Sequence, residues 1–82
     1  MPNTTPPLRV FIPGDRVAYT RRFLKAIGSG PERYQWRGTV HRVQDLSEVT
    51  AVHVSWDQIG PGTFAVLSNN LRLVRDLHKE PV

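Results

Sequence analysis

Apolar and polar side chains alternate at residues 16–19 and 50–56, which is the pattern of strands with one buried face, and apolar or β-branched stretches between turn-forming residues indicate further strands. The clearest stretch places Val52, Val54 and Trp56 on one side, with smaller or polar residues between them. The predicted strands cover residues 16–19, 37–43, 50–56, 63–67 and 71–74. The side chains predicted to supply most of the core are Val17, Val40, Val52, Val54, Trp56, Phe64, Val66, Leu71 and Leu73. The sequence therefore predicts an all-β fold.

The connections before the second strand contain a turn and a helical pattern. A Pro-Gly pair at positions 13–14 favours a type II turn, because proline fixes its own φ and glycine accepts a positive one. In the long first loop, Phe23, Leu24 and Ile27 have helical spacing and are followed by Gly28, a residue type that commonly ends helices. We expect a helix of about one or two turns in this loop.

Two further turns and the chain length complete the domain outline. Residues 57–62 predict a hairpin turn, and residues 68–70 predict a 3₁₀ turn before the last strand. The 82 residues suffice for only one hydrophobic core. Because its first eight residues include three prolines, the segment 1–9 is predicted to be a disordered tail, followed by a domain at 10–75 and a polar C-terminal tail at 76–82.

The composition favours a protein of the cytoplasm. The chain contains no cysteine, which fits a reducing compartment. It has no run of about 18 apolar residues that would cross a bilayer, and its first residues lack the pattern of a signal peptide. We therefore expect a cytoplasmic protein without membrane contacts.

Two short motifs resemble the opening of SH3-like barrels, which are small closed sheets of five strands. Gly-Asp-Arg-Val at 14–17 and Trp-Arg-Gly-Thr-Val at 36–40 are similar to a pattern in several such families. These families include KOW-type modules, the β subunit of nitrile hydratase and the photosystem I subunit that docks ferredoxin. The resemblance spans residues 11–74 and implies a five-stranded SH3-like barrel.

The chain also resembles the plasmid-borne type II dihydrofolate reductases, which are similarly short and form a tetramer around one pore. The shared positions are Phe11, Gly14, Asp15, Arg16, Val17, Trp36, Gly38, Pro61, Gly62, Asn70 and Leu71. The chain departs from that family at its pore-lining residues. Phe-Ala-Val-Leu at 64–67 replaces the family's Val-Gln-Ile-Tyr, and Ala18 and Tyr19 stand where it has a lysine. The scaffold is thus similar, whereas reductase activity and a bound cofactor are not expected.

The positive charge is concentrated in the first half of the chain. The formal net charge is +4, and the sequence pI is about 10.4. Between positions 9 and 42, eight Lys or Arg residues stand against two acidic residues, whereas the rest of the chain has three against five. Concentrated positive charge favours an anionic partner such as a nucleic acid or an acidic protein surface.

Aromatic residues lie among these basic residues, which is typical of nucleic-acid-binding surfaces that combine phosphate contacts with base stacking. The predicted anion-binding residues are Arg21, Arg22, Lys25, Arg33, Tyr34 and Arg37. The alternative is structural: Phe23 and Trp36 fill the core, Tyr19 covers one end of the barrel, and the arginines form a solvated face. Arg21 and Arg22 then pair with acidic residues or a partner subunit.

No catalytic or metal-binding constellation is evident in the sequence. His41 and His53 lie on neighbouring predicted strands, and one register would place them opposite each other. Two histidines do not complete a zinc site. The serines lack a nucleophile motif, and the glycines do not form a phosphate-binding loop. At the end of the third strand, Trp56 is expected to close the core and Asp57 to cap the turn through its side chain.

Three hypotheses follow from these features. The first is a non-enzymatic binding module that engages an anionic partner through its basic and aromatic first half. The second is a homo-oligomeric enzyme, or enzyme relic, of the type II reductase kind. The third is a structural adaptor that joins a larger complex through a strand edge. The sequence leaves open whether the protein is a monomer or a homo-oligomer.

Overall fold

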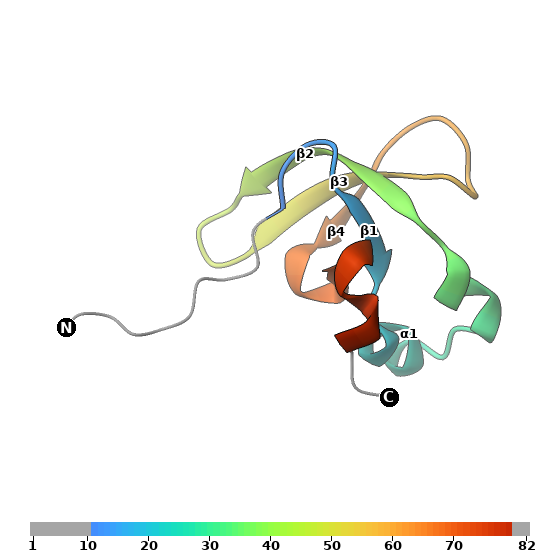
Figure 1. Cartoon of the computed structure of the whole chain (residues 1–82). Helices are drawn as coiled ribbons and strands as arrows, with labels where there is room; N and C mark the ends of the chain where they lie inside the picture. Colours follow the sequence, from blue (N-terminus) through green and yellow to red (C-terminus); the bar gives the residue numbers. More distant parts are fainter. Residues whose placement is uncertain (1–10, 80–82) are drawn as a thin grey trace.

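The computed structural model describes residues 11–79, so the predicted tail at 1–9 and residues 80–82 lie outside the described part. Residues 11–79 form one antiparallel sheet with a short α-helix and three 3₁₀ helices, η1 to η3 (Figure 1). In order, the elements are β1 Arg16–Tyr19, α1 Arg21–Ala26, η1 Pro31–Gln35, β2 Gly38–Asp45, β3 Thr50–Trp56, β4 Phe64–Leu67, η2 Ser68–Asn70, β5 Leu71–Leu73 and η3 Val74–Lys79. The predicted all-β fold, short helix and final 3₁₀ turn are confirmed.

The five strands are ordered β4-β3-β2-β1-β5, so β4 and β5 form the two edges. The pairings among residues 11–79 include no ladder between these edges, and the sheet is therefore not closed. The segment η2 connects the two edge strands directly, and the backbone N–H of Thr20 donates to the carbonyl of Asn70 at 2.9 Å. The β2–β3 hairpin tip and the α1–η1 segment lie at opposite ends of the sheet (Figure 1).

The turn before β1 forms as predicted. Gly14 has φ +95°, which places it in the position of a type II turn that requires a positive φ. The backbone N–H of Asp15 donates to the carbonyl of Ile12 at 3.1 Å, and the Asp15 carboxylate accepts from the N–H of Ile12 at 3.0 Å. Gly14 also donates its N–H to the carbonyl of Val40 at 2.8 Å, which ties the turn to β2.

A bulge in β2 changes the predicted pairing of the two histidines. Val40 faces Val54, but the next paired residue is Arg42, which faces His53. His41 is the extra residue of the bulge, so the register that would place His41 opposite His53 does not occur. His53 instead places Nε2 3.3 Å from Oε1 of Gln44.

The core lies on one face of the sheet, and the predicted core residues are confirmed except for Phe64. The buried cluster consists of Phe11, Val17, Val40, Val52, Val54, Trp56, Val66, Leu71 and Leu73. Phe64 is 44% exposed because it begins the edge strand β4, beyond which no strand of the sheet lies. Leu24 of α1, which is fully buried, was not among the predicted core residues.

The described chain continues as a 3₁₀ helix beyond the predicted domain boundary. The sequence favours a polar tail from residue 76, yet residues Val74–Lys79 form η3. This helix lies against β1 and β5. The partly buried Leu77 supplies an apolar residue within the otherwise polar segment.

Candidate functional site

Three of the predicted anion-binding residues lie on α1. Thr20 begins this helix as its N-cap, with Oγ1 accepting from the N–H of Phe23 at 3.1 Å. Leu24 is the buried residue of the helix, whereas Arg21, Arg22 and Lys25 are exposed. Their spacing of three and four residues places Lys25 beside both arginines on the helix surface.

Two arginines of the predicted set lie over aromatic rings. Cζ of Arg21 is 5.5 Å from the ring centre of Tyr34, and this contact joins α1 to η1. Cζ of Arg33 is 4.9 Å from the ring centre of Trp36. Tyr34 and Trp36 are each partly exposed, so these cation–π pairs are formed at the protein surface.

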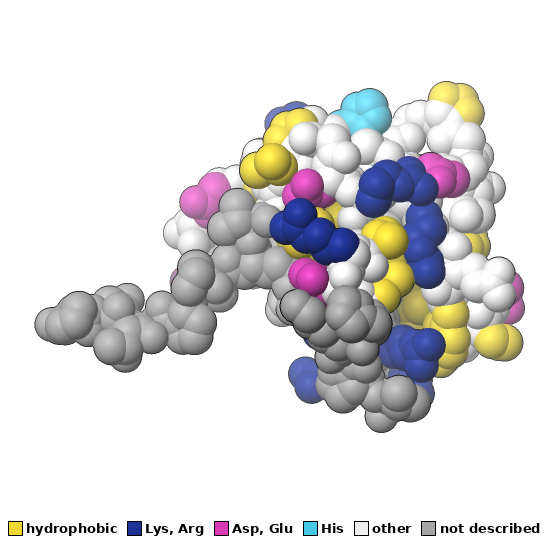
Figure 2. All heavy atoms as spheres, viewed as in Figure 1, with side chains coloured by type: hydrophobic (Ala, Val, Ile, Leu, Met, Phe, Trp, Pro, Cys, Tyr) yellow, Lys and Arg dark blue, Asp and Glu magenta, His cyan; other side chains and the backbone are white. Residues whose placement is uncertain are grey.

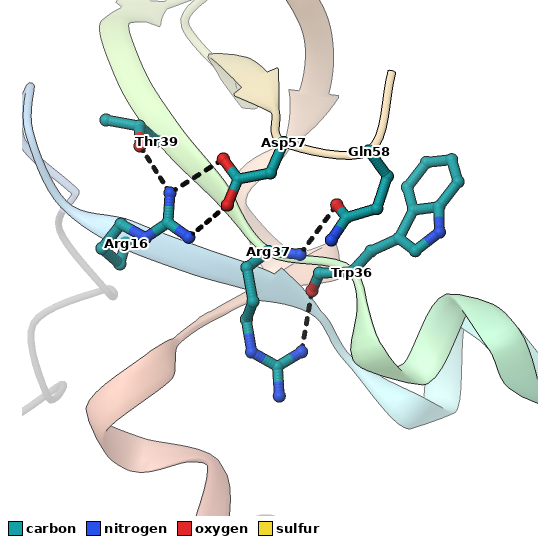
Figure 3. A network of polar contacts seen from close by, with 6 residues as sticks. All are labelled: Arg16, Trp36, Arg37, Thr39, Asp57 and Gln58. Atoms are coloured by element: carbon teal, nitrogen blue, oxygen red, sulfur yellow. Dashed lines mark hydrogen bonds and ion pairs between the residues drawn. The ribbon is translucent and has the colours of Figure 1, made fainter. Parts of the chain in front are cut away.

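Arg37 holds the backbone between these two rings. Its Nη1 donates to the carbonyl of Tyr34 at 3.0 Å and to the carbonyl of Trp36 at 2.8 Å. Its backbone N–H donates to Oε1 of Gln58 at 3.2 Å, which links the end of η1 to the β3–β4 turn (Figure 3). Arg37 therefore has a structural role as well as a charge at this surface.

A stack of aromatic rings joins α1 to the core. The rings of Phe23 and Tyr19 are 5.2 Å apart, and those of Tyr19 and Trp56 are 4.4 Å apart with an angle of 20° between them. Trp36 meets Trp56 at 6.1 Å in a tilted arrangement. The alternative that Phe23 and Trp36 fill the core is correct only in part: Trp36 packs against the core but stays partly exposed, whereas Phe23 is partly exposed and stacks on Tyr19.

Burial in this stack raises the pKa of the Tyr19 hydroxyl, and the nearby charge of Arg33 partly opposes that shift. Geometry links the same groups, because Arg33 lies over Trp36 and the ring of Trp36 meets Trp56 of the stack. The ring stack and Arg33 therefore belong to one region of the molecule.

We call this region the α1–η1 surface, and its members are Arg21, Arg22, Lys25, Arg33, Tyr34, Trp36 and Arg37. On the face seen in Figure 2, dark blue side chains gather over β1 and towards α1, with yellow side chains between them. The two cation–π pairs and Arg37 join Arg21, Arg33, Tyr34 and Arg37 directly. Arg22 and Lys25 belong to the surface through their position on α1.

An ion pair between β1 and the β3–β4 turn was not predicted. Nη1 and Nη2 of Arg16 donate to the two carboxylate oxygens of Asp57 at 3.0 and 2.5 Å, and Nη1 also donates to Oγ1 of Thr39 at 2.8 Å (Figure 3). These hydrogen bonds lower the pKa of Asp57 and raise that of Arg16. The side chain of Asp57 thus binds Arg16 instead of capping the turn as predicted. The 41 residues between the partners explain why no local pattern indicated the pair.

Two structural features bear on metal binding and on membrane insertion. Within residues 11–79, no group of three or more His, Asp or Glu side chains is placed to hold a metal ion. No helix in that same part of the chain has the length and apolar content to span a bilayer.

The segment that stands where the reductases have their pore-lining residues, Phe64–Leu67, forms the edge strand β4. Phe64 and Leu67 are 44% and 43% exposed, and Val66 is buried in the core. Its four side chains contain only carbon and hydrogen, so none of them forms a hydrogen bond with a ligand.

Comparison with known proteins finds no match: no family model fits this sequence, and no curated protein or solved structure is significantly similar to it.

Proposed function

We propose that this chain is a small non-enzymatic binding module of SH3-like fold that holds a nucleic acid on the α1–η1 surface. The observation that carries the proposal is the pairing of cations with partly exposed rings, Arg21 with Tyr34 and Arg33 with Trp36. The five antiparallel strands and the 3₁₀ turn before the last strand support the SH3-like assignment.

The positive charge around these pairs favours a ligand that carries phosphate groups. Five Lys and Arg residues lie between Thr20 and Gly38, and Glu32 is the only acidic residue in that segment. By contrast, Asp57 already neutralises Arg16, so that arginine adds little to the field. Each phosphate that a cation contacts releases condensed counterions, and this release drives nucleic-acid binding at moderate salt.

Fluorescence anisotropy with labelled single- and double-stranded oligonucleotides, at about 50 and 200 mM salt, tests this proposal. We expect binding that weakens steeply with salt. If the wild-type protein binds no oligonucleotide with salt-sensitive affinity, the nucleic-acid assignment is wrong, and an acidic protein partner becomes the better explanation of the charge.

A matched pair of variants separates local contacts from net charge. Arg22→Ala removes an exposed cation of the α1–η1 surface, whereas Arg42→Ala removes an exposed cation from β2. We expect Arg22→Ala to weaken binding more than Arg42→Ala, although both lower the net charge equally. Equal losses of affinity in the two variants would mean that these cations act only through the net charge of the molecule and not through local contacts.

The edge strand β4 favours a second candidate function, that of a structural adaptor. Residues Phe64–Leu67 contain no charge and no proline, which are the usual devices that protect an edge from pairing with another strand. Partly exposed Phe64 and Leu67 offer apolar contacts to such a strand. A Phe64→Lys variant tests this candidate, because it should abolish any self-association or complex formation that sedimentation detects in the parent.

A further inference from the structure

We infer that the ligand of the α1–η1 surface is a single-stranded nucleic acid, with unpaired bases stacking at Tyr34 and Trp36 while phosphates contact Arg21 and Arg33. This inference rests on the proposed function and specifies its ligand. It follows from how rings and cations are placed together at this surface.

Each ring of this surface has a cation beside it. Arg21 lies over Tyr34, and Arg33 lies over Trp36. A nucleic-acid strand likewise repeats a flat base next to each charged phosphate. When the arginine turns to a phosphate, the ring face it covered becomes available to the adjacent base, and a guanidinium that stays in place is itself a flat stacking partner.

The backbone that carries the two rings is held in place before any ligand binds, and the ring of Trp36 is also held by packing. Arg37 donates hydrogen bonds to the carbonyls of Tyr34 and Trp36 and so restrains the backbone that carries both rings. Trp36 also packs against the core and meets the buried ring of Trp56. Restrained rings lose less conformational entropy on binding than mobile ones, which favours stacking as a source of affinity.

The rings favour single strands over duplexes. In a duplex the faces of the bases are covered by their neighbours, so a protein reads base edges through the grooves. On the α1–η1 surface the candidate contacts are instead two partly exposed rings, that of Tyr34 in η1 and that of Trp36, the C-cap residue of η1. Stacking on a ring requires an exposed base face, which unpaired strands provide.

Binding of three probes to the wild-type protein tests the inference without any variant. The probes are oligo(dT) of roughly 10 to 15 nucleotides, an abasic strand of the same length, and a duplex of that length. Oligo(U) as an additional probe reports whether RNA serves as well as DNA. Tryptophan fluorescence is a second readout, since Trp36 is partly exposed whereas Trp56 is 1% exposed.

We expect oligo(dT) to bind about ten-fold or more tightly than the abasic strand and to quench tryptophan fluorescence, because stacking contributes to each contacted base. If the abasic strand or the duplex binds as tightly as oligo(dT), with salt-sensitive affinity and no quenching, the single-strand inference is overturned while the proposed function stands. If none of the probes binds, the proposed function fails as well.

Two variants then assign the stacking to named rings. Trp36→Phe retains a ring and should preserve the preference for oligo(dT) over the abasic strand, whereas Trp36→Ala should reduce it. Because Trp36 packs against the core, Tyr34→Ala provides an independent variant, and thermal unfolding confirms that each variant is folded. Variants that fold and keep the full preference would contradict stacking at these positions.

Discussion

Gly38 lies where β2 passes close to β3. A Cβ atom at this position would lie 2.5 Å from Cγ1 of Val54, 2.9 Å from Cε3 of Trp56 and 3.0 Å from the carbonyl oxygen of Ser55. Contacts this short force the two strands apart, and Val54 and Trp56 belong to the core. The glycine in the Trp-Arg-Gly motif is therefore explained by close packing of the sheet.

We predict that Gly38→Ala lowers the free energy of unfolding by roughly 1–3 kcal/mol, the usual cost of overpacking a core. Gly30→Ala is the control, since the added Cβ atom would meet only the flexible carboxylate of Glu32. Urea denaturation of both variants checks the prediction. A Gly38→Ala protein as stable as the parent would show that the strands accommodate the methyl group.

The Arg16–Asp57 pair predicts a pH dependence of stability. Hydrogen bonding to Arg16 lowers the pKa of Asp57 in the folded protein below its value in the unfolded chain. The pair therefore stabilises the fold fully above the unfolded pKa, and this contribution is lost as the pH falls through the folded pKa. Because both side chains are about half exposed, the effect is expected to be small.

Asp57→Asn should unfold at a lower denaturant concentration than the parent at neutral pH, and the difference should vanish in acid. Denaturation midpoints of both proteins across this pH range provide the measurement. A difference that persists at the lowest pH, where Asp57 is protonated, would assign the loss to some interaction other than the ion pair.

At the scale of elements, α1 determines where three of the surface cations lie. Thr20 supplies the N-cap oxygen for the N–H of Phe23, and Leu24 anchors the six-residue helix in the protein interior. A helix this short depends on its cap and its packing, because nucleation alone is unfavourable. The N-cap is thus part of the structure that presents Arg21 and Arg22.

We predict that Thr20→Ala destabilises the fold by about 1 kcal/mol, the typical cost of a lost N-cap. Thr20→Ser keeps the hydroxyl oxygen and should be close to the parent. Thermal unfolding by circular dichroism compares the three proteins. The cap is dispensable if the serine and alanine variants melt together at the parent's temperature.

The elements differ in how well local sequence indicates them. Alternating apolar and polar side chains indicated β3. The helical spacing of apolar side chains before Gly28, which has φ +70°, indicated α1. By contrast, η1 has no apolar periodicity, and only Pro31 at its start is a local signal. The bulge at His41 and the exposure of Phe64 depend on strand pairing and on edge position, which are properties of the sheet rather than of any segment.

The candidate surface was predicted in its composition but not in its contacts. The cation–π pair of Arg33 and Trp36 joins a residue of η1 to its C-cap residue, and it depends on a 3₁₀ helix that local sequence indicates only through Pro31. The contact between Arg21 and Tyr34 depends on how α1 and η1 pack together. The hydrogen bonds from Arg37 to the carbonyls of Tyr34 and Trp36 depend on the path of the chain after η1.

At the scale of the whole molecule, the residues of β4 bear on the alternative enzymatic hypothesis. Because the side chains of Phe64–Leu67 cannot donate or accept hydrogen bonds, we predict no dihydrofolate reduction. NADPH oxidation in a preparation free of host reductase checks this against a no-enzyme control. Consumption above that control would favour the type II reductase hypothesis over the binding module.

The salt dependence of binding tests the α1–η1 surface most directly. We would measure oligonucleotide affinity over a range of salt for the parent and for the Arg21→Ala/Arg22→Ala variant. The slope of log K against log salt should become shallower by up to about two phosphate equivalents. Loss of the Arg21–Tyr34 contact should cost only about 0.5–1 kcal/mol of stability. A folded double variant whose affinity and slope equal those of the parent would contradict nucleic-acid binding at this surface.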